Sequence, residues 1–194
     1  MPAPPKHREA ILRAAMNRFR RHGYSGTGLK DIVKDSGAPR GSVYHYFPGG
    51  KPEIAEAAIR TAGGNVTATL KMLAGQRATP GDVVLGFAEL IAGWMAESGF
   101  RDGSPMTTVL LEAAPDDELV TAAGREAFDD WRRVIAAGLK TGGATAERAE
   151  TLALLSIAAI EGSLVQARVE GDAAPILMVG AELKDLIDRE LPVR

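Results

Sequence analysis

Helical periodicity is the feature that most limits what this chain can fold into. Apolar residues recur three or four positions apart through most of the sequence, as at Ile11, Ala15 and Phe19. No stretch alternates apolar and polar residues for long enough to form a sheet. Glycine and proline separate the apolar runs, for instance at residues 48–50 (Pro-Gly-Gly). The pattern predicts an all-α fold of about nine helices.

The breaks place three short helices before the longer ones. We therefore expect an N-terminal three-helix domain at residues 1–52 and a larger helical bundle at residues 53–194. The first helix is predicted to end near residue 22. The others are predicted to span residues 29–36, 39–47, 52–75, 81–98, 105–114, 116–140, 146–169 and 174–191.

Charge is divided unevenly between these two parts. Residues 1–53 carry ten Lys and Arg against four Asp and Glu, a net charge of +6, and all three histidines. The remaining residues carry 13 basic against 21 acidic side chains, a net charge of −8. A basic head on an acidic body indicates that the head binds a polyanion such as nucleic acid, although a solvated basic face would have the same composition.

The sequence lacks the signatures of metal-binding and nucleotide-binding proteins. The chain has no cysteine, which excludes disulfides and thiolate metal sites, and no histidine pair stands with carboxylates at metal-ligand spacing. The glycine-rich residues 23–28 follow no predicted strand, so they do not match a phosphate-binding loop. We therefore expect no metal, no cofactor and no enzymatic activity.

The N-terminal segment is basic and has no apolar core of the kind found in signal peptides. The longest apolar stretch, residues 152–160, is half the length that a membrane span needs. The expectation is a soluble cytoplasmic protein that does not associate with membranes.

Residues 23–51 form the most informative motif. Two short predicted helices joined by a tight turn at Gly37 are typical of a helix-turn-helix. In the first turn of the second helix, Arg40 and Ser42 can reach base edges, and Gly41 leaves room for close approach to the backbone. Exposed backbone N–H groups at a helix start also attract phosphate.

Consecutive rings at Tyr44, His45 and Tyr46 cannot all point inward from one helix. Since Val43 and Phe47, four positions apart, form the inner stripe, at least one of the three rings must face solvent or DNA. Tyr and His donors directed at phosphates would fix the register on the duplex.

Two further side chains complete the predicted interface. Thr27 can cap the first helix of the motif or contact phosphate, and Lys51, beside the start of the fourth helix, is a candidate phosphate contact.

These residues resemble the DNA-binding domain of the tetracycline-repressor (TetR) family. The matching residues are Ile32-Val33, Ser36-Gly37, Gly41-Ser42-Val43-Tyr44, Tyr46-Phe47 and Lys51. The resemblance implies an all-helical homodimer that represses transcription and leaves DNA when a small ligand binds its C-terminal domain. The DNA contacts that it implies are Thr27, Lys30, Arg40, Ser42, Tyr44, His45, Tyr46 and Lys51. This chain departs from the family pattern in two places: Pro39 replaces the usual capping Ser or Thr, and the spacing from Phe47 to Lys51 is one residue longer.

The C-terminal half resembles the LmrA/YxaF-like multidrug-responsive subgroup. The matching features are Gly103-Ser104-Pro105, Leu111-Glu112, Phe128 with Trp131, and Glu161-Gly162. The resemblance implies a small hydrophobic or aromatic effector in an apolar pocket. The candidate pocket residues are Phe87, Leu90, Ile91, Trp94, Met95, Met106, Val109, Leu110, Glu112, Phe128, Trp131 and Ile135. A packed core would require the same apolar stripes, and a neighbouring Arg or backbone group would equally satisfy Glu112.

The last two helices are the candidate dimer surface. In the resembled family, these helices from two subunits form a four-helix interface. The candidate contact residues are Leu152, Leu155, Ala159, Gly162, Leu164, Val165, Leu177 and Leu183. A single helix-turn-helix contacts few base pairs, so a homodimer on double-stranded DNA with a palindromic operator is the physical expectation.

Two alternatives stay open at this point. A DNA-binding regulator controlled by a protein partner would have a filled C-terminal bundle, whereas a ligand-responsive one would have a cavity beside Trp94 and Trp131. The sequence is also compatible with activation of transcription.

Overall fold

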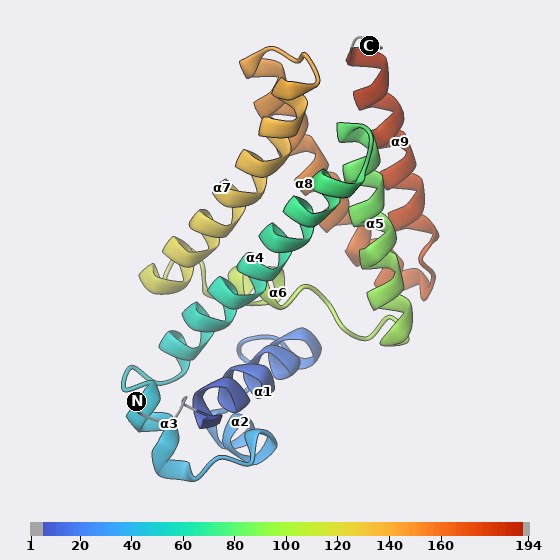
Figure 1. Ribbon diagram of the computed structural model, residues 1–194. Helices are drawn as coiled ribbons and strands as arrows, with labels where there is room; N and C mark the ends of the chain where they lie inside the picture. Colours follow the sequence, from blue (N-terminus) through green and yellow to red (C-terminus); the bar gives the residue numbers. More distant parts are fainter. Residues whose placement is uncertain (1–5, 192–194) are drawn as a thin grey trace. The chain divides into compact units, whose positions relative to one another are not determined.

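The computed structural model describes residues 6–191, and within that range the fold consists of nine helices and no strand (Figure 1). The all-α prediction is therefore confirmed, and the predicted ends lie within two residues of those observed. The helices are α1 (Lys6–His22), α2 (Leu29–Ser36), α3 (Arg40–Tyr46), α4 (Lys51–Gln76), α5 (Pro80–Glu97), α6 (Pro105–Ala113), α7 (Glu118–Thr141), α8 (Ala146–Glu170) and α9 (Ala174–Glu190).

The helices form two compact units that do not follow the boundary expected between residues 52 and 53. Within the described range, the first unit contains residues 6–63 and 104–127, and the second contains residues 64–103 and 128–191. Helix α6 and the first part of α7 therefore group with the N-terminal helices. The functional division into a DNA-binding domain at residues 1–52 and a ligand-binding and dimerisation domain at residues 53–194 stays a prediction.

The core of the first unit is built on α1, which packs against α2, α3 and α6. Its inner stripe of Ile11, Ala15 and Phe19 is fully buried, as the periodicity predicted. Helix α6 is also tied to α1 by a hydrogen bond, because the Thr108 hydroxyl donates to the Phe19 carbonyl oxygen at 3.0 Å. Residues from beyond position 100 thus help to support the N-terminal helices.

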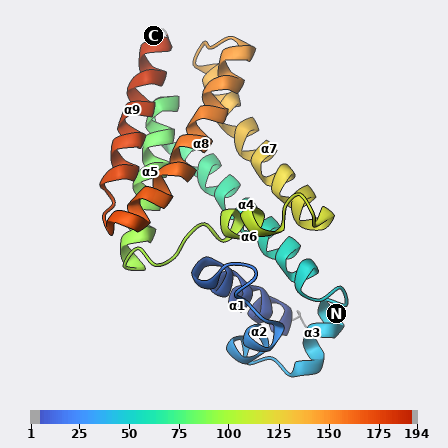
Figure 2. The ribbon, with the colours of Figure 1, turned by 180° about the vertical axis from the view of Figure 1, so that it is seen from behind.

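In the second unit, α5, α8 and α9 lie side by side, as Figures 1 and 2 both show. Thr79 caps the start of α5, because its hydroxyl accepts a hydrogen bond from the Asp82 N–H at 3.0 Å. Gly180 of α9 faces Ala88 of α5 so closely that an added Cβ would lie 2.5 Å from the Ala88 Cβ. A glycine at this position lets the two helices approach each other.

Length and composition alone would allow one helix in the described part of the chain, α8, to cross a membrane. The sequence prediction counted only the apolar residues 152–160 and so missed this longer window. However, 44% of the window is buried within the fold, and α8 packs against α5 and α9. A single helix of this kind in the described residues is weak evidence for a membrane span.

Candidate nucleic-acid interface

The turn between α2 and α3 has the geometry that a helix-turn-helix requires. Gly37 ends α2 in the left-handed region, with φ +64°, where a glycine is favoured. The Ser36 hydroxyl accepts a hydrogen bond from the Ala38 N–H at 3.2 Å, and Pro39 then precedes α3. Pro39 provides no side-chain cap, as its departure from the family pattern predicted.

Helix α3 has one buried and one exposed face. Val43 and Phe47 are each 1% exposed, which confirms the predicted inner stripe. On the other face, Tyr44 is 60% exposed, and the exposed His45 packs edge-on against Tyr46 with ring centroids 4.9 Å apart. The prediction that at least one ring points outward is confirmed.

The first turn of α3 is open to an approaching ligand. Arg40 and Gly41 are exposed, and Ser42 is half-buried. Within residues 6–191, no other element lies within 4 Å of where a Gly41 Cβ would stand. Lys30 on α2 is also exposed. These residues are free to meet DNA in the way that the sequence predicted, although the contacts themselves stay a prediction.

Some basic residues of the first unit are engaged within the fold. The Arg18 guanidinium on α1 donates to the Asp35 carboxylate on α2 at 2.6 Å, and this hydrogen bond lowers the pKa of Asp35. The Arg8 guanidinium lies 5.4 Å from the centre of the Phe47 ring. Both contacts connect α1 to the helix-turn-helix, so they support its structure.

Thr27 does not take either of the roles predicted for it. Its side chain is fully buried, and its hydroxyl donates to the Gly23 carbonyl oxygen at 2.7 Å. The residue that caps α2 is Gly28, whose N–H donates to the Asp31 carboxylate at 3.2 Å. In this conformation the Thr27 hydroxyl stabilises the turn before α2 and is not available to a phosphate.

Lys51, a predicted phosphate contact, instead donates to the same turn. Its ammonium group donates to the carbonyl oxygens of Tyr24, at 2.8 Å, and Thr27, at 3.1 Å. The Nζ atom also lies 4.1 Å from the centre of the Tyr24 ring. Two of its three N–H donors are therefore used inside the protein.

Glu112 on α6 contacts the backbone N–H groups of the same turn, which precedes α2. Its carboxylate accepts hydrogen bonds from the backbone N–H groups of Tyr24, at 3.0 Å, and Ser25, at 2.7 Å. Hydrogen bonding from Ser25 is the largest cause that lowers the pKa of Glu112. This fits the structural alternative for Glu112 rather than its predicted place in a ligand pocket. Since 87 residues separate Ser25 from Glu112, no local sequence signal could reveal this contact.

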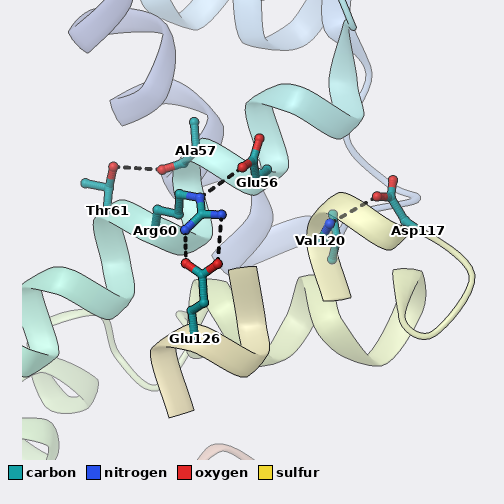
Figure 3. A network of polar contacts seen from close by, with 7 residues as sticks. All are labelled: Glu56, Ala57, Arg60, Thr61, Asp117, Val120 and Glu126. Carbon is teal, nitrogen blue, oxygen red and sulfur yellow. Dashed lines mark hydrogen bonds and ion pairs between the residues drawn. The ribbon is translucent and has the colours of Figure 1, made fainter. Parts of the chain in front are cut away.

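A second polar network joins α4 and α7 within the first unit (Figure 3). The Arg60 guanidinium donates to the Glu56 carboxylate at 2.9 Å and also to the carboxylate of Glu126 on α7. The Asp117 carboxylate accepts from the Val120 N–H at 3.0 Å and so caps α7. The sequence did not reveal the bond between Arg60 and Glu126 for the same reason, because 66 residues separate the two partners.

The predicted pocket residues divide between the two units. In the first unit, Met106 and Val109 are buried, and half-buried Leu110 packs against Gly124. In the second unit, Leu90 and Phe128 are half-buried, Trp94 is 49% exposed, and the buried residues are Phe87, Ile91, Met95, Trp131 and Ile135. Burial of this kind fits a packed core as well as a pocket lining, so their ligand role stays a prediction.

An open polar hollow of about 450 Å³ lies in the second unit. It is lined by Asp129, Arg132, Arg133, Glu150, Thr151 and Leu154. None of these residues belongs to the predicted pocket, and their charges do not suit the apolar effector that the resemblance implies.

The predicted dimer residues fall into three groups by exposure. Leu152 and Leu183 are 1% and 5% exposed, so they belong to the core of the second unit rather than to an accessible surface. Ala159 and Leu164 are half-buried. The accessible members are Leu155, Gly162, Val165 and Leu177.

Comparison with known proteins agrees with this geometry. Residues 11–58 match the family described as bacterial regulatory proteins, tetR family, and residues 80–182 match the C-terminal domain of LmrA/YxaF-like transcriptional regulators. An uncharacterised HTH-type transcriptional regulator of Mycobacterium tuberculosis is 31% identical over 192 residues, which cover 96% of this chain and 97% of the relative. YxaF of Bacillus subtilis, also uncharacterised, is 31% identical over 94% of this chain and 96% of its own length.

Solved structures of this family have the same fold. The crystal structure of a regulatory protein TetR from Rhodobacter sphaeroides has a TM-score of 0.79 and 26% identity, covering 91% of this chain and 96% of that one. A TetR regulator from Chloroflexus aurantiacus has a TM-score of 0.81 at 24% identity, covering 97% of each chain. The chain therefore belongs to the TetR family of DNA-binding transcriptional regulators, which are not enzymes, and its C-terminal domain is of the LmrA/YxaF-like type.

Proposed function

We propose that this chain is a homodimeric repressor that binds a palindromic operator through α3 and leaves it when a small hydrophobic or aromatic effector binds. The observation that carries the proposal is the outward face of α3, which presents Arg40, Tyr44 and His45 while Val43 and Phe47 fix the helix in the core. A regulator of this kind acts on chromosomal DNA, so we place it in the cytoplasm.

The exposed residues of α3 suit different roles on DNA. Arg40, in the first turn, carries a guanidinium that can bond bidentately to a guanine edge and so read sequence. Tyr44, His45 and Tyr46 offer donors to phosphates, which fix register without reading sequence. Lys30, exposed on α2, adds a phosphate contact.

Exposed apolar side chains on α8 and α9 support the proposed homodimer. Val165 is 59% exposed, and Leu155 and Leu177 are each 42% exposed. Among the described residues, no other element lies within 4 Å of where a Gly162 Cβ would stand, which leaves room for a helix of a second copy. Burial of such side chains by a partner is favourable by about 25 cal/mol per Å².

Effector release would be a shift between two conformations. The effector must bind more tightly to the conformation whose recognition helices do not fit the operator; a ligand with equal affinity for both would shift nothing. A second candidate is control by a protein partner, with which the burial of Ile91, Met95 and Trp131 is equally compatible.

Electrophoretic titration of promoter fragments from the same genome tests the proposed function. We expect a few fragments to be retarded at low protein concentration, each by two copies of the chain. Leu177→Glu should keep the fold, because the residue is exposed, but should sediment as a monomer and lose operator binding. A wild-type protein that binds the operator as a monomer, or a monomeric Leu177→Glu that binds it as tightly as wild type, would contradict the dimer.

A further inference from the structure

We propose that Glu112 of α6 is a positioning residue for DNA binding, although it lies outside the helix-turn-helix. It holds the turn of residues 23–28 in place together with Lys51 of α4. The inference rests on the proposed function and names a residue on which operator affinity depends.

The turn is held from two sides by opposite charges. Glu112 accepts from the N–H groups of Tyr24 and Ser25, whereas Lys51 donates to the carbonyl oxygens of Tyr24 and Thr27. Each charged group meets the backbone groups that it can bond, and charge-assisted hydrogen bonds are stronger than neutral ones. The turn is thus fixed by two helices, α4 and α6, that are remote from it in sequence.

Gly23 makes room for the carboxylate. Its φ of +71° lies in the left-handed region, and a Cβ added there would stand 2.1 Å from a carboxylate oxygen of Glu112. Any side chain at position 23 would therefore displace Glu112. The glycine serves both the end of α1 and the contact with α6.

The turn leads directly into the DNA-binding helices. Gly28 caps α2, and Lys30 lies two residues further along that helix. A turn freed from Glu112 would allow the start of α2 to shift, and with it Lys30. The carboxylate is therefore expected to improve DNA affinity by fixing geometry, even though its negative charge repels phosphate.

These two effects of Glu112 have opposite signs, which makes the proposal testable. Glu112→Gln removes a negative charge from the DNA-binding unit, so electrostatics alone predicts tighter binding to DNA. The amide, however, retains one acceptor oxygen and presents an NH₂ group where an acceptor is needed. Positioning therefore predicts weaker binding.

The experiment is a fluorescence-anisotropy titration of an operator duplex with the full-length wild type, Glu112→Gln and Glu112→Asp. We expect each variant to bind about fivefold to tenfold more weakly, which is less than the full effect of losing a charge-assisted hydrogen bond because the turn keeps its contacts with Lys51. Glu112→Asp keeps the charge and shortens the side chain, so it decides the question if Glu112→Gln does not fold. The matched control is Glu118→Gln, which removes an exposed charge from α7 in the same unit and should bind as well as wild type or slightly better.

Hydrogen exchange supplies a readout specific to the proposed contact. The backbone N–H groups of Tyr24 and Ser25 should exchange faster in both Glu112 variants, while the core of the second unit stays protected. Folded Glu112 variants that bind the operator as tightly as wild type would overturn the inference. Failure of the wild type and of Glu118→Gln to bind any DNA would instead overturn the proposed function.

Discussion

Lys51→Met separates two roles that a lysine at the edge of a DNA-binding unit can have. In this structure its ammonium group makes two hydrogen bonds, of 2.8 and 3.1 Å, to carbonyl oxygens, and it lies over the Tyr24 ring. Hydrogen bonds to charged groups contribute about 1.5–3 kcal/mol each when buried, and a cation–π contact at an exposed site about 0.5–1 kcal/mol. Because Lys51 is only half-buried, we expect the variant to lose about 2 kcal/mol of unfolding free energy in total.

Two measurements distinguish the roles. For a chain of this length, a loss of about 2 kcal/mol lowers Tm by about 4–8 °C. The salt dependence of DNA binding should change by less than about half a unit in log–log slope, because the lysine is engaged within the protein. A direct phosphate contact would instead account for about 0.9 of that slope.

Lys30→Met is the matched control, since it removes the same charge from an exposed residue of the same unit. It should leave Tm unchanged and reduce the salt slope by about 0.9. If Lys51→Met gave that result, with full stability and a reduced slope, Lys51 would be a phosphate contact and the assignment to the turn would be wrong.

Three other predictions follow from single features. Arg40→Ala should reduce the preference for operator over unrelated DNA by about 1–3 kcal/mol, and equal weakening on all sequences in competition titrations would remove Arg40 from base reading. Gly180→Val should lower the unfolding free energy, measured by urea titration, by about 2 kcal/mol, because any Cβ at position 180 meets Ala88. The control Gly93→Ala places its Cβ in open space, so it should raise the unfolding free energy by up to about 1 kcal/mol. Because the folded-state pKa of Glu112 is lowered, mainly by hydrogen bonding from Ser25, its carboxylate stabilises the fold above the ordinary pKa of Glu, about 4.3. The stability difference between wild type and Glu112→Gln should be full above that pH and should shrink as pH falls through the lowered folded-state pKa, whereas a difference that does not change with pH would contradict the bond.

Local patterns predicted the fold and the inner and outer faces of α3. The spacing of Val43 and Phe47 is a property of one helix, and glycine and proline act on the backbone within a few residues, so the helix ends could be read from the chain. The three consecutive rings at 44–46 required one to face outward for the same local reason.

The sequence did not reveal contacts between residues far apart along the chain. The contacts of Lys51 and Glu112 with the turn could not be predicted, because a charged residue beside a motif offers no sign of which backbone groups it will meet. Leu152 and Leu183 lie on helices that also carry exposed leucines, and periodicity alone did not distinguish the core face from the accessible face. In each case tertiary packing, which a single sequence does not specify, decided the role.

The most direct test of the proposed operator recognition is hydroxyl-radical footprinting on a genomic fragment selected by the full-length protein. Two protected half-sites related by a two-fold axis, with centres separated by a whole number of helical turns of about 10 base pairs, are the result that the account predicts. An asymmetric footprint, or protection unchanged in Arg40→Ala, would contradict the proposal that a pair of α3 helices reads the operator.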